Sequence, residues 1–518
     1  MNNKKEDDIF VLELPLSVEK WQSDLLDRRY EYLRQIYNYA QRKLIRQYIY
    51  LVQTEEYKKC RTKKDKSSFF GNHEFWFNGI KCPITFTEFG IKKYVTKLCK
   101  LKVSSGMTYK DFGLNSSHLE TLGANMWAAW DKKIYGKGER INIKRYGCLN
   151  TFSVRCKSGY FGGLKVILDG NEIYLFLDMN GKKGEKEKKE IKLTVKIGKM
   201  TEYEMQALRN GIENIRMVTI ARKLVRGKYK YYVQFAIKDE KPKKGRKLGK
   251  GSVGIDVGPS TVAVSSLHGV EINTLAEKCD DIHRKVRLIQ RKMDRSSRAS
   301  NPQNYNEDGT IKKVRGQKLK WVRSKNYVRL RNEKRELMRK QAAIRKLSHN
   351  IDTNKLLELG DTFVVEDNPI SSWTKRASGI RKGKNGKNLS NKRYGKSVAN
   401  HAPAAYVEIL KNKVESLGGK FIKVDTKNGA SGYDFTTGEY TKHGVEKRKV
   451  TLSNGNVHQR DMLAAFNLQH LNYEDGELKS YNVEEMEKDY PIFCKLEKEE
   501  IKRYTSGQKT SHKSTVGY

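Results

Sequence analysis

The sequence predicts a bilobed chain of mixed α/β class, in which a β-barrel interrupted by helices precedes a domain of alternating strands and helices. Three observations lead to this prediction. Strand-like segments with apolar residues at alternate positions dominate residues 136–245, a Lys/Gly/Pro-rich linker follows at 238–252, and the order of elements changes after it. The length of 518 residues also exceeds the usual domain size of roughly 100–200 residues.

The N-terminal part is predicted to open with a short strand, so that residues 1–18 form the first piece of the barrel. Residues 19–135 are expected to form a mainly helical domain inserted into it. Within this domain, residues 19–53 predict one long helix because apolar side chains recur at spacings of three and four. Asn115 predicts the N-cap of a second helix.

Residues 136–245 are expected to complete the barrel. Their strand-like segments alternate apolar and polar residues and are rich in aromatic and β-branched side chains. The dipeptide Asp169-Gly170 predicts a hairpin turn between two of them. The segments predicted as strands are INIKRY, FSVRC, KVILDGNEIYLFLD, IKLTVKI and KYKYYVQFAI.

Residues 246–470 are expected to form the second domain. Three short strands are followed by a basic helical insertion at 276–350, a strand at 361–367, and then helix, strand and helix. This is the element order of an RNase H-like domain. The Gly/Ser/Lys-rich loop at 371–398 has two open interpretations, a mobile lid and a disordered linker. Residues 471–518 are polar and are predicted to be a disordered tail.

Charge indicates the class of partner. Lys and Arg number 104 against 60 Asp and Glu, so the net charge is +44. A polyanion is the natural partner because each neutralised phosphate releases condensed counterions. No apolar run approaches the ~18 residues that a membrane span needs, and no membrane partner is expected. Seven scattered cysteines without a C-x-x-C pair favour reduced thiols and a cytosolic location.

Three acidic residues are the candidate catalytic and metal-binding residues. Asp256 lies within an apolar strand, Glu366 ends another, and Asp461 begins the last predicted helix, where the helix dipole favours its ionised form. Gly254 and Gly258 are expected to leave room beside Asp256 for a nucleic-acid backbone or a metal-bound water.

Such a set suits phosphodiester hydrolysis with two Mg²⁺ ions. Ions about 3.5–4 Å apart activate a water and stabilise the leaving oxygen, and Mg²⁺ prefers oxygen ligands. Each acid alone is weak evidence, since an Asp in a strand is often only hydrogen-bonded and an Asp opening a helix is usually a cap. Two interpretations are open for Asp367. It either orients the metal ligands or is an exposed acid at the end of a strand.

The segments GIDVG, VVEDNP and QRDMLAAFN resemble the three RuvC signatures of the TnpB family and of miniature type V CRISPR effectors. The resemblance is specific over about 250–470 and looser over 1–245. It implies a RuvC nuclease domain, preceded by a wedge barrel that carries a helical recognition domain. It also implies that Asp256, Glu366 and Asp461 form the one catalytic site.

The same resemblance implies the partners. A structured guide RNA is expected, together with double-stranded target DNA that enters the site as a single strand. A short motif beside the target would be read by the N-terminal half. We expect a monomer in the prokaryotic cytoplasm. The gene context of this chain, in a transposon or beside a CRISPR array, stays open.

One departure from the family concerns zinc. Family members usually carry a four-Cys zinc element between the second and third signatures, which would be the target-strand-loading element at 427–457. No Cys occurs between Cys279 and Cys494, and a closed structural site needs about four N or S ligands. His443 and His458 are expected to be surface residues, so no structural zinc is predicted.

Other functions remain open from the sequence. A nuclease-inactive RNA-guided repressor would share all of these sequence features and would differ only in not assembling the metal ions at the three acids. A DNA transposase would use a related fold, but no clear helix-turn-helix is visible. A basic RNA-packaging or ribosome-associated protein would leave the placement of the acids unexplained. The helices at 276–350 are expected to contact the guide–target duplex by its backbone and shape, and solvated helix faces are the alternative.

Overall fold

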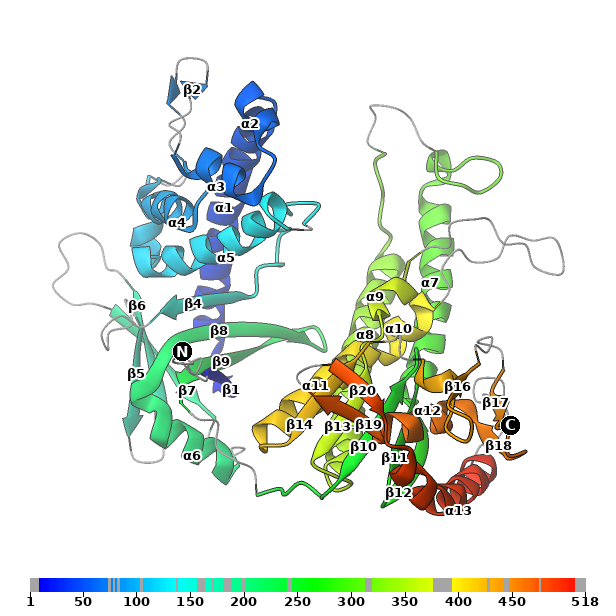
Figure 1. Ribbon diagram of the computed structural model, residues 1–518. Coiled ribbons are helices and arrows are strands. Elements are labelled where there is room, and N and C mark those ends of the chain that lie inside the picture. Colours follow the sequence, from blue (N-terminus) through cyan, green and yellow to red (C-terminus); the bar gives the residue numbers. More distant parts are fainter. Residues whose placement is uncertain are drawn as a thin grey trace. The chain divides into compact units, whose positions relative to one another are not determined.

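The computed structural model divides the chain into two units, Met1–Pro242 and Lys243–Tyr518 (Figure 1). The division falls within the predicted linker. The structure describes residues 9–72, 76–77, 80–81, 84–102, 106–136, 138–155, 164–169, 172–179, 189–196, 201–239, 245–312, 319–375, 394–425, 429–441, 447–474 and 477–507.

The first unit is built on a seven-stranded sheet, a nearly closed barrel with the strand order β4-β8-β9-β1-β7-β6-β5. In β1, Leu12, Leu14 and Leu16 are buried while the residues between them are more exposed, as expected for a strand with one face on the core. The predicted hairpin is confirmed, because Asp169 of β5 pairs with Glu172 of β6. The strands are β1 (Ile9–Ser17), β4 (Thr151–Arg155), β5 (Leu164–Asp169), β6 (Glu172–Met179), β7 (Lys189–Val195), β8 (Ile215–Val225) and β9 (Lys228–Lys238).

Helices supply the rest of this unit, and they share one hydrophobic core with the sheet. The predicted long helix is α1, whose Glu19 and Gln22 form a capping box. Asn115 caps α5 as predicted, since its Oδ1 accepts from the backbone N–H groups of Ser117 and His118. The helices are α1 (Lys20–Leu51), α2 (Glu55–Lys59), α3 (Lys63–Asn72), α4 (Glu88–Lys97), α5 (Ser116–Ile134) and α6 (Glu202–Gly211), with a small hairpin of β2 (Trp76–Phe77) and β3 (Ile80–Lys81).

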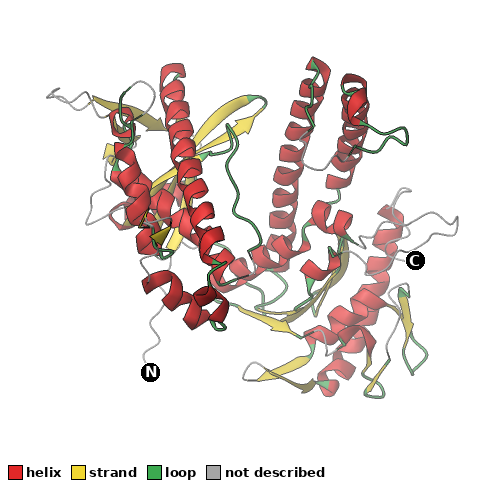
Figure 2. Cartoon of the chain, turned by 90° about the horizontal axis from the view of Figure 1, so that it is seen from above, coloured by secondary structure: helices red, strands yellow, loops and turns green. Residues whose placement is uncertain are grey.

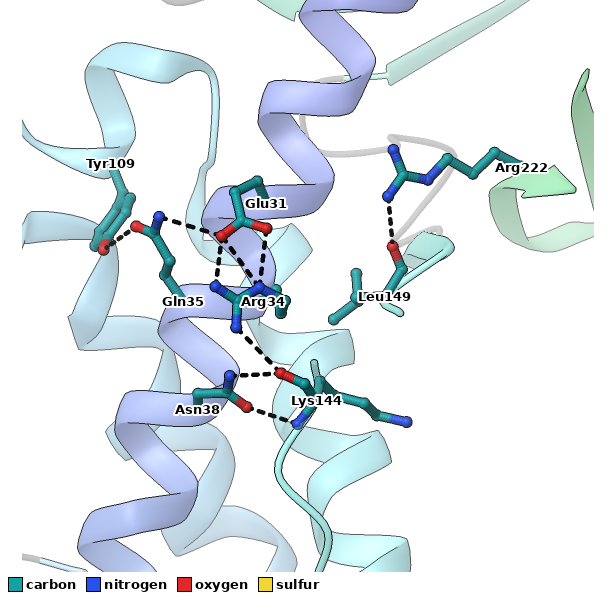
Figure 3. Close-up of polar contacts among 8 residues, drawn as sticks. All are labelled: Glu31, Arg34, Gln35, Asn38, Tyr109, Lys144, Leu149 and Arg222. Atoms are coloured by element: carbon teal, nitrogen blue, oxygen red, sulfur yellow. Dashed lines mark hydrogen bonds and ion pairs between the residues drawn. The ribbon is translucent and has the colours of Figure 1, made fainter. Parts of the chain in front are cut away.

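One predicted strand is wrong. The segment INIKRY, residues 141–146, pairs with no strand in the part of the chain that the structure describes. Side chains of α1 satisfy its backbone instead. Asn38 donates to the carbonyl of Lys144 at 2.8 Å and accepts from its N–H at 2.8 Å, and Arg34 donates to the same carbonyl at 3.1 Å (Figure 3). The alternation of apolar and polar residues could not reveal that side chains of α1 would form hydrogen bonds with this backbone.

Some cations of this unit hold the fold together. Arg34 pairs with Glu31 at 2.5 Å on the same helix. Arg222 of β8 donates to the carbonyl of Leu149 at 3.3 Å, and its guanidinium lies 4.4 Å from the ring centre of Tyr30 and 4.3 Å from that of Tyr229 (Figure 3). Such arginines are committed to internal contacts, so they contribute little to the surface offered to a polyanion.

The second unit contains a five-stranded sheet with the order β12-β11-β10-β13-β14. Neighbours β12, β11 and β10 pair antiparallel, whereas β10, β13 and β14 pair parallel. This confirms the predicted order of elements. The strands are β10 (Ser252–Val257), β11 (Thr261–Ser266), β12 (Gly269–Thr274), β13 (Thr362–Glu366) and β14 (Lys420–Val424), with the short pairs β15 (Tyr433–Asp434) and β16 (Glu439–Tyr440), and β17 (Lys449–Thr451) and β18 (Val457–Gln459).

The predicted basic insertion forms two helices that lie side by side, α7 and α8 (Figure 2). Of the loop predicted at 371–398, residues 376–393 lie outside the described residues, and helices occupy parts of both ends. No helix in the described ranges has an apolar stretch long enough to cross a bilayer. The helices of this unit are α7 (Cys279–Ser300), α8 (Lys325–Leu356), α9 (Ile370–Trp373), α10 (Gly395–His401), α11 (Pro403–Ser416), α12 (Arg460–Gln469) and α13 (Val483–Gly507).

The prediction of a disordered tail at 471–518 is wrong for most of its length. Residues Leu471–Glu474 and Glu477–Tyr481 form the hairpin β19–β20, and α13 follows. Met486 and Phe493 of α13 are buried in a core shared with α12. Their apolar spacing is diluted by many charged residues, which explains why the segment appeared polar. Residues 508–518 lie outside the described residues.

Candidate active site

The three predicted carboxylates come from three elements that meet at one end of the second sheet. Asp256 lies on β10 and Glu366 is the last residue of β13, the parallel neighbour of β10. Asp461 lies in the first turn of α12. All three line one cavity of about 330 Å³. The carboxyl ends of parallel strands are where α/β sheets commonly bind ligands.

Close packing of α12 on β10 depends on Gly254. A Cβ at this position would lie 1.9 Å from the carbonyl oxygen of Ala465, a backbone atom that cannot easily move. The prediction that Gly254 leaves room for a nucleic acid is therefore wrong. It leaves room for α12, and so it positions Asp461. Gly258 lies in the turn after β10, where its N–H donates to the carbonyl of Thr261 at 2.9 Å.

The cavity concentrates negative charge. Burial raises the pKa of Asp256 well above its ordinary value, and the nearby carboxylates of Asp461 and Glu366 raise it further. Burial also raises the pKa of Glu366, and a hydrogen bond from Asn368 opposes this effect. The three carboxyl groups thus disfavour one another's ionised form within the cavity.

Two arginines compensate part of this charge. Arg460 contacts Oδ1 of Asp461 at 2.9 Å, and Arg448 contacts Oδ2 at 3.2 Å. The Asp461 side chain is almost buried, so these pairs are shielded from water and are stronger than surface pairs. Both arginines also lower the pKa of Asp256. Both oxygens of Asp461 therefore face a guanidinium group.

The donor set suits Mg²⁺ in kind, since this ion takes one or two carboxylates together with waters and phosphate oxygens. The mutual repulsion that raises the pKa of Asp256 is the kind of charge that a divalent cation relieves. Among the described residues, however, no three His, Cys, Asp or Glu side chains are grouped closely enough to hold a metal ion as they stand. Asp461 would have to exchange its arginine contacts for a metal contact.

Several lining residues were missed by the sequence analysis. Arg460 directly precedes Asp461 and could have been suspected on that ground, whereas Arg448 lies in a polar stretch without any periodic signal. Trp373 and Tyr394 add two aromatic side chains to the wall of the cavity. Asp367 does not line it: this residue is exposed and lies 3.3 Å from Lys423.

The 427–457 segment beside the cavity is held by polar and aromatic contacts. Asn467 of α12 donates to the carbonyls of Ala430 and Tyr433 at 2.8 and 2.9 Å. Tyr433 stacks on Tyr481 of β20, with ring centres 3.8 Å apart. Asp434 accepts from the N–H and hydroxyl of Ser453. These contacts show how the described part of the segment keeps its shape, and the absence of structural zinc stays a prediction.

The prediction that His458 is a surface residue is wrong. Its ring is buried, with Nδ1 lying 2.6 Å from Glu497 and Nε2 lying 2.7 Å from the hydroxyl of Tyr490, both on α13. Glu497 also accepts from the N–H of Gln459 at 2.8 Å. The helix α13 therefore fixes the strand that leads into Asp461. His443 lies outside the described residues.

Comparisons with known proteins give low similarity. No family model matches the chain, and no curated protein matches it. A Cas12f1–sgRNA–target DNA complex aligns with a TM-score of 0.42 at 12% identity, covering 91% of this chain and 99% of that chain. A CRISPR–Cas12f ternary complex aligns with a TM-score of 0.29 at 14% identity, covering 89% of this chain and 83% of that chain. A Cas12i1 R-loop complex after target DNA cleavage aligns with a TM-score of 0.29 at 9% identity, covering 93% of this chain and 61% of that chain. These TM-scores are too low to establish a shared fold.

Proposed function

We propose that this chain is an RNA-guided DNA endonuclease that cuts target DNA in one RuvC-type site, next to a short adjacent motif. The observation that carries the proposal is the cavity at the end of β10 and β13. Three acids that are far apart in the sequence line this cavity together with two arginines. The RNase H-like order of strands in the sheet supports it, as do the three sequence signatures around these acids.

The chemistry follows from the residues. Asp256, Glu366 and Asp461 would hold the two Mg²⁺ ions, which when bound supply an activated water and stabilise the leaving oxygen. Arg448 and Arg460 carry guanidinium groups that match phosphate oxygens in a bidentate manner. They would hold the phosphodiester once Asp461 has turned away from them. Trp373 and Tyr394 offer faces on which an unpaired base could stack.

The basic character of the chain supports the RNA and DNA partners. The helices α7 and α8 carry many Lys and Arg residues on exposed positions. Such helices suit a duplex recognised by its backbone, while base pairing supplies the sequence specificity. We infer that α7 and α8 contact the guide–target duplex, and that the first unit is the wedge and recognition part.

A nuclease-inactive DNA-binding repressor is the second candidate. The arginine contacts on both oxygens of Asp461 favour it, because they occupy the atoms that a metal ion would need. A single experiment separates the two candidates, since only the endonuclease needs the metal site.

The purified protein with its guide RNA should cut a matching plasmid in Mg²⁺ and not in a chelator. Asp256→Ala should abolish cutting yet leave binding of RNA and target nearly unchanged, because phosphate contacts elsewhere supply the affinity. Target binding without cleavage by the wild-type protein would favour the repressor. Cutting by Asp256→Ala would contradict the proposed site.

A further inference from the structure

A second, smaller cavity adjoins the carboxylate cavity in the same unit. Its volume is about 180 Å³, and it shares Ser260, Thr261 and Ser397 with the first cavity. The two cavities therefore meet at three residues that carry hydroxyl groups.

The lining combines cations with hydroxyl donors. Arg284 of α7 and Lys396 of α10 contribute the positive charges. The guanidinium of Arg284 lies 3.7 Å from Asp281, which is too long for a hydrogen bond, and its side chain is 61% exposed. It can therefore turn toward a ligand at little cost, because an exposed pair of this kind contributes little to stability.

The acid in the lining is already engaged. Asp280 accepts from the Asn400 amide at 3.2 Å and lies 3.6 Å from Nε2 of His401. The other ring nitrogen of His401 lies 2.5 Å from the carbonyl of Leu275, which fixes the ring. Asp280 thus orders the two side chains around it and does not cancel both cations.

The electrostatic surroundings point the same way. Next to this lining, the pKa of His283 is lowered by burial first and then by the positive charges of Lys396 and Arg287, against a smaller opposite effect of Asp280. A histidine whose protonation is opposed by neighbouring cations lies in a region of surplus positive charge. Such a region favours an anion.

We propose that the second cavity is a phosphate subsite, which binds a backbone phosphate of the same DNA strand whose neighbouring phosphodiester lies at the carboxylates. This inference rests on the proposed function. A strand carries one charge per nucleotide, so a phosphate at the carboxylates places another close by. Cations, hydroxyls and an adjoining carboxylate cavity suit such a strand, and the subsite would fix its path and direction.

The test uses target strands in which single phosphodiesters near the cut are replaced by neutral methylphosphonates. For the wild-type complex, one neutral linkage beside the scissile one should lower kcat/KM about tenfold, since charge-assisted hydrogen bonds are lost. The variant Arg284→Gln/Lys396→Gln should be about tenfold slower on the normal strand, and the same neutral linkage should then cost it no more than about twofold.

Lys411→Gln serves as the control, because it removes a positive charge from α11 without lining either cavity. The control variant should keep the full sensitivity of the wild type to the neutral linkage. In the double variant, placing Lys instead of Gln at position 284 should restore part of that sensitivity. An equal loss in wild type and double variant would overturn the subsite. If no strand is cut at all, the proposed function fails, and the same comparison by strand affinity in a chelator still decides the subsite.

Discussion

Asp256 is a candidate catalytic residue that is expected to lower the stability of the folded chain. Its carboxyl group is held among two further carboxylates in a partly enclosed cavity. Residues that serve a site in this way commonly cost stability, and removing them stabilises the fold. We therefore predict that Asp256→Asn raises the free energy of unfolding in a chelator by about 1 kcal/mol. Thermal melting measures this change.

Mg²⁺ separates this prediction from a merely structural role of Asp256. The ion should raise the melting temperature of the wild-type protein and have a smaller effect on Asp256→Asn, because binding to the native state alone stabilises it. A variant that melts below the wild type in a chelator would contradict the account of repulsion between the carboxylates.

His118 makes the first unit sensitive to acid. Its ring is buried, and burial together with the charge of Arg29 lowers its pKa from 6.5 to about 3. Below pH 6.5 the unfolded chain binds a proton that the folded chain refuses, so stability falls with pH by about 1.4 kcal/mol per unit. This loss continues until the pH approaches the folded-state value.

The corresponding prediction is that His118→Gln removes about 2 kcal/mol of the stability difference between about pH 7.5 and about pH 5. Chemical denaturation at the two pH values measures it. His268→Gln, at an exposed position of the second unit, is the control and should behave like the wild type. An unchanged pH dependence in His118→Gln would show that the buried ring is not the acid-sensitive group.

Among the residues of the cavity, local sequence patterns indicated where the three candidate acids lie better than they indicated the neighbouring residues. Asp256 and Glu366 stand in short apolar strands, and Asp461 opens a helix, so their positions follow from local patterns. Arg448 could not be found in this way, because only the fold brings it to Asp461. The role of Gly254 was also hidden, since it depends on which helix packs against β10.

Among the elements, α13 matters more for the site than its sequence suggests. Glu497 and His458 form a buried pair, and Glu497 also holds the backbone of Gln459, two residues before Asp461. Removing one partner of a buried pair typically costs about 3–5 kcal/mol. We predict that Glu497→Ala destabilises the second unit by about 3 kcal/mol, as measured by chemical denaturation.

A matched control lies on the same helix. Glu499 is exposed, and Glu499→Ala should change the free energy of unfolding by less than about 0.5 kcal/mol. Glu497→Gln, which keeps an acceptor for the Gln459 N–H, should fall between the two. Equal stability of Glu497→Ala and Glu499→Ala would show that α13 does not hold the strand before Asp461.

The elements that the sequence predicted well are those with strong local patterns. These include α1, the hairpin at Asp169-Gly170 and the strands of the second sheet. The errors came where another part of the chain decides the outcome. Residues 141–146 alternate like a strand but bond to α1, and 471–507 is polar overall yet buries one face against α12.

At the scale of the whole molecule, charge is the dominant property. A chain of net charge +44 opposes its own compaction through repulsion between cations. Ion pairs such as that of Arg34 with Glu31 leave this net charge unchanged, because each pair contributes zero to it. We expect a long structured RNA to copurify with the protein, and its sequence identifies the guide.

The most direct test of the RNA-guided account is to replace the guide segment of that RNA and leave the protein unchanged. Cleavage should move to the plasmid that matches the new guide and be lost from the original one, because base pairing supplies the specificity. Continued cutting of the original target with its original specificity, after the guide is replaced or the RNA is digested, would contradict the account and favour a DNA transposase.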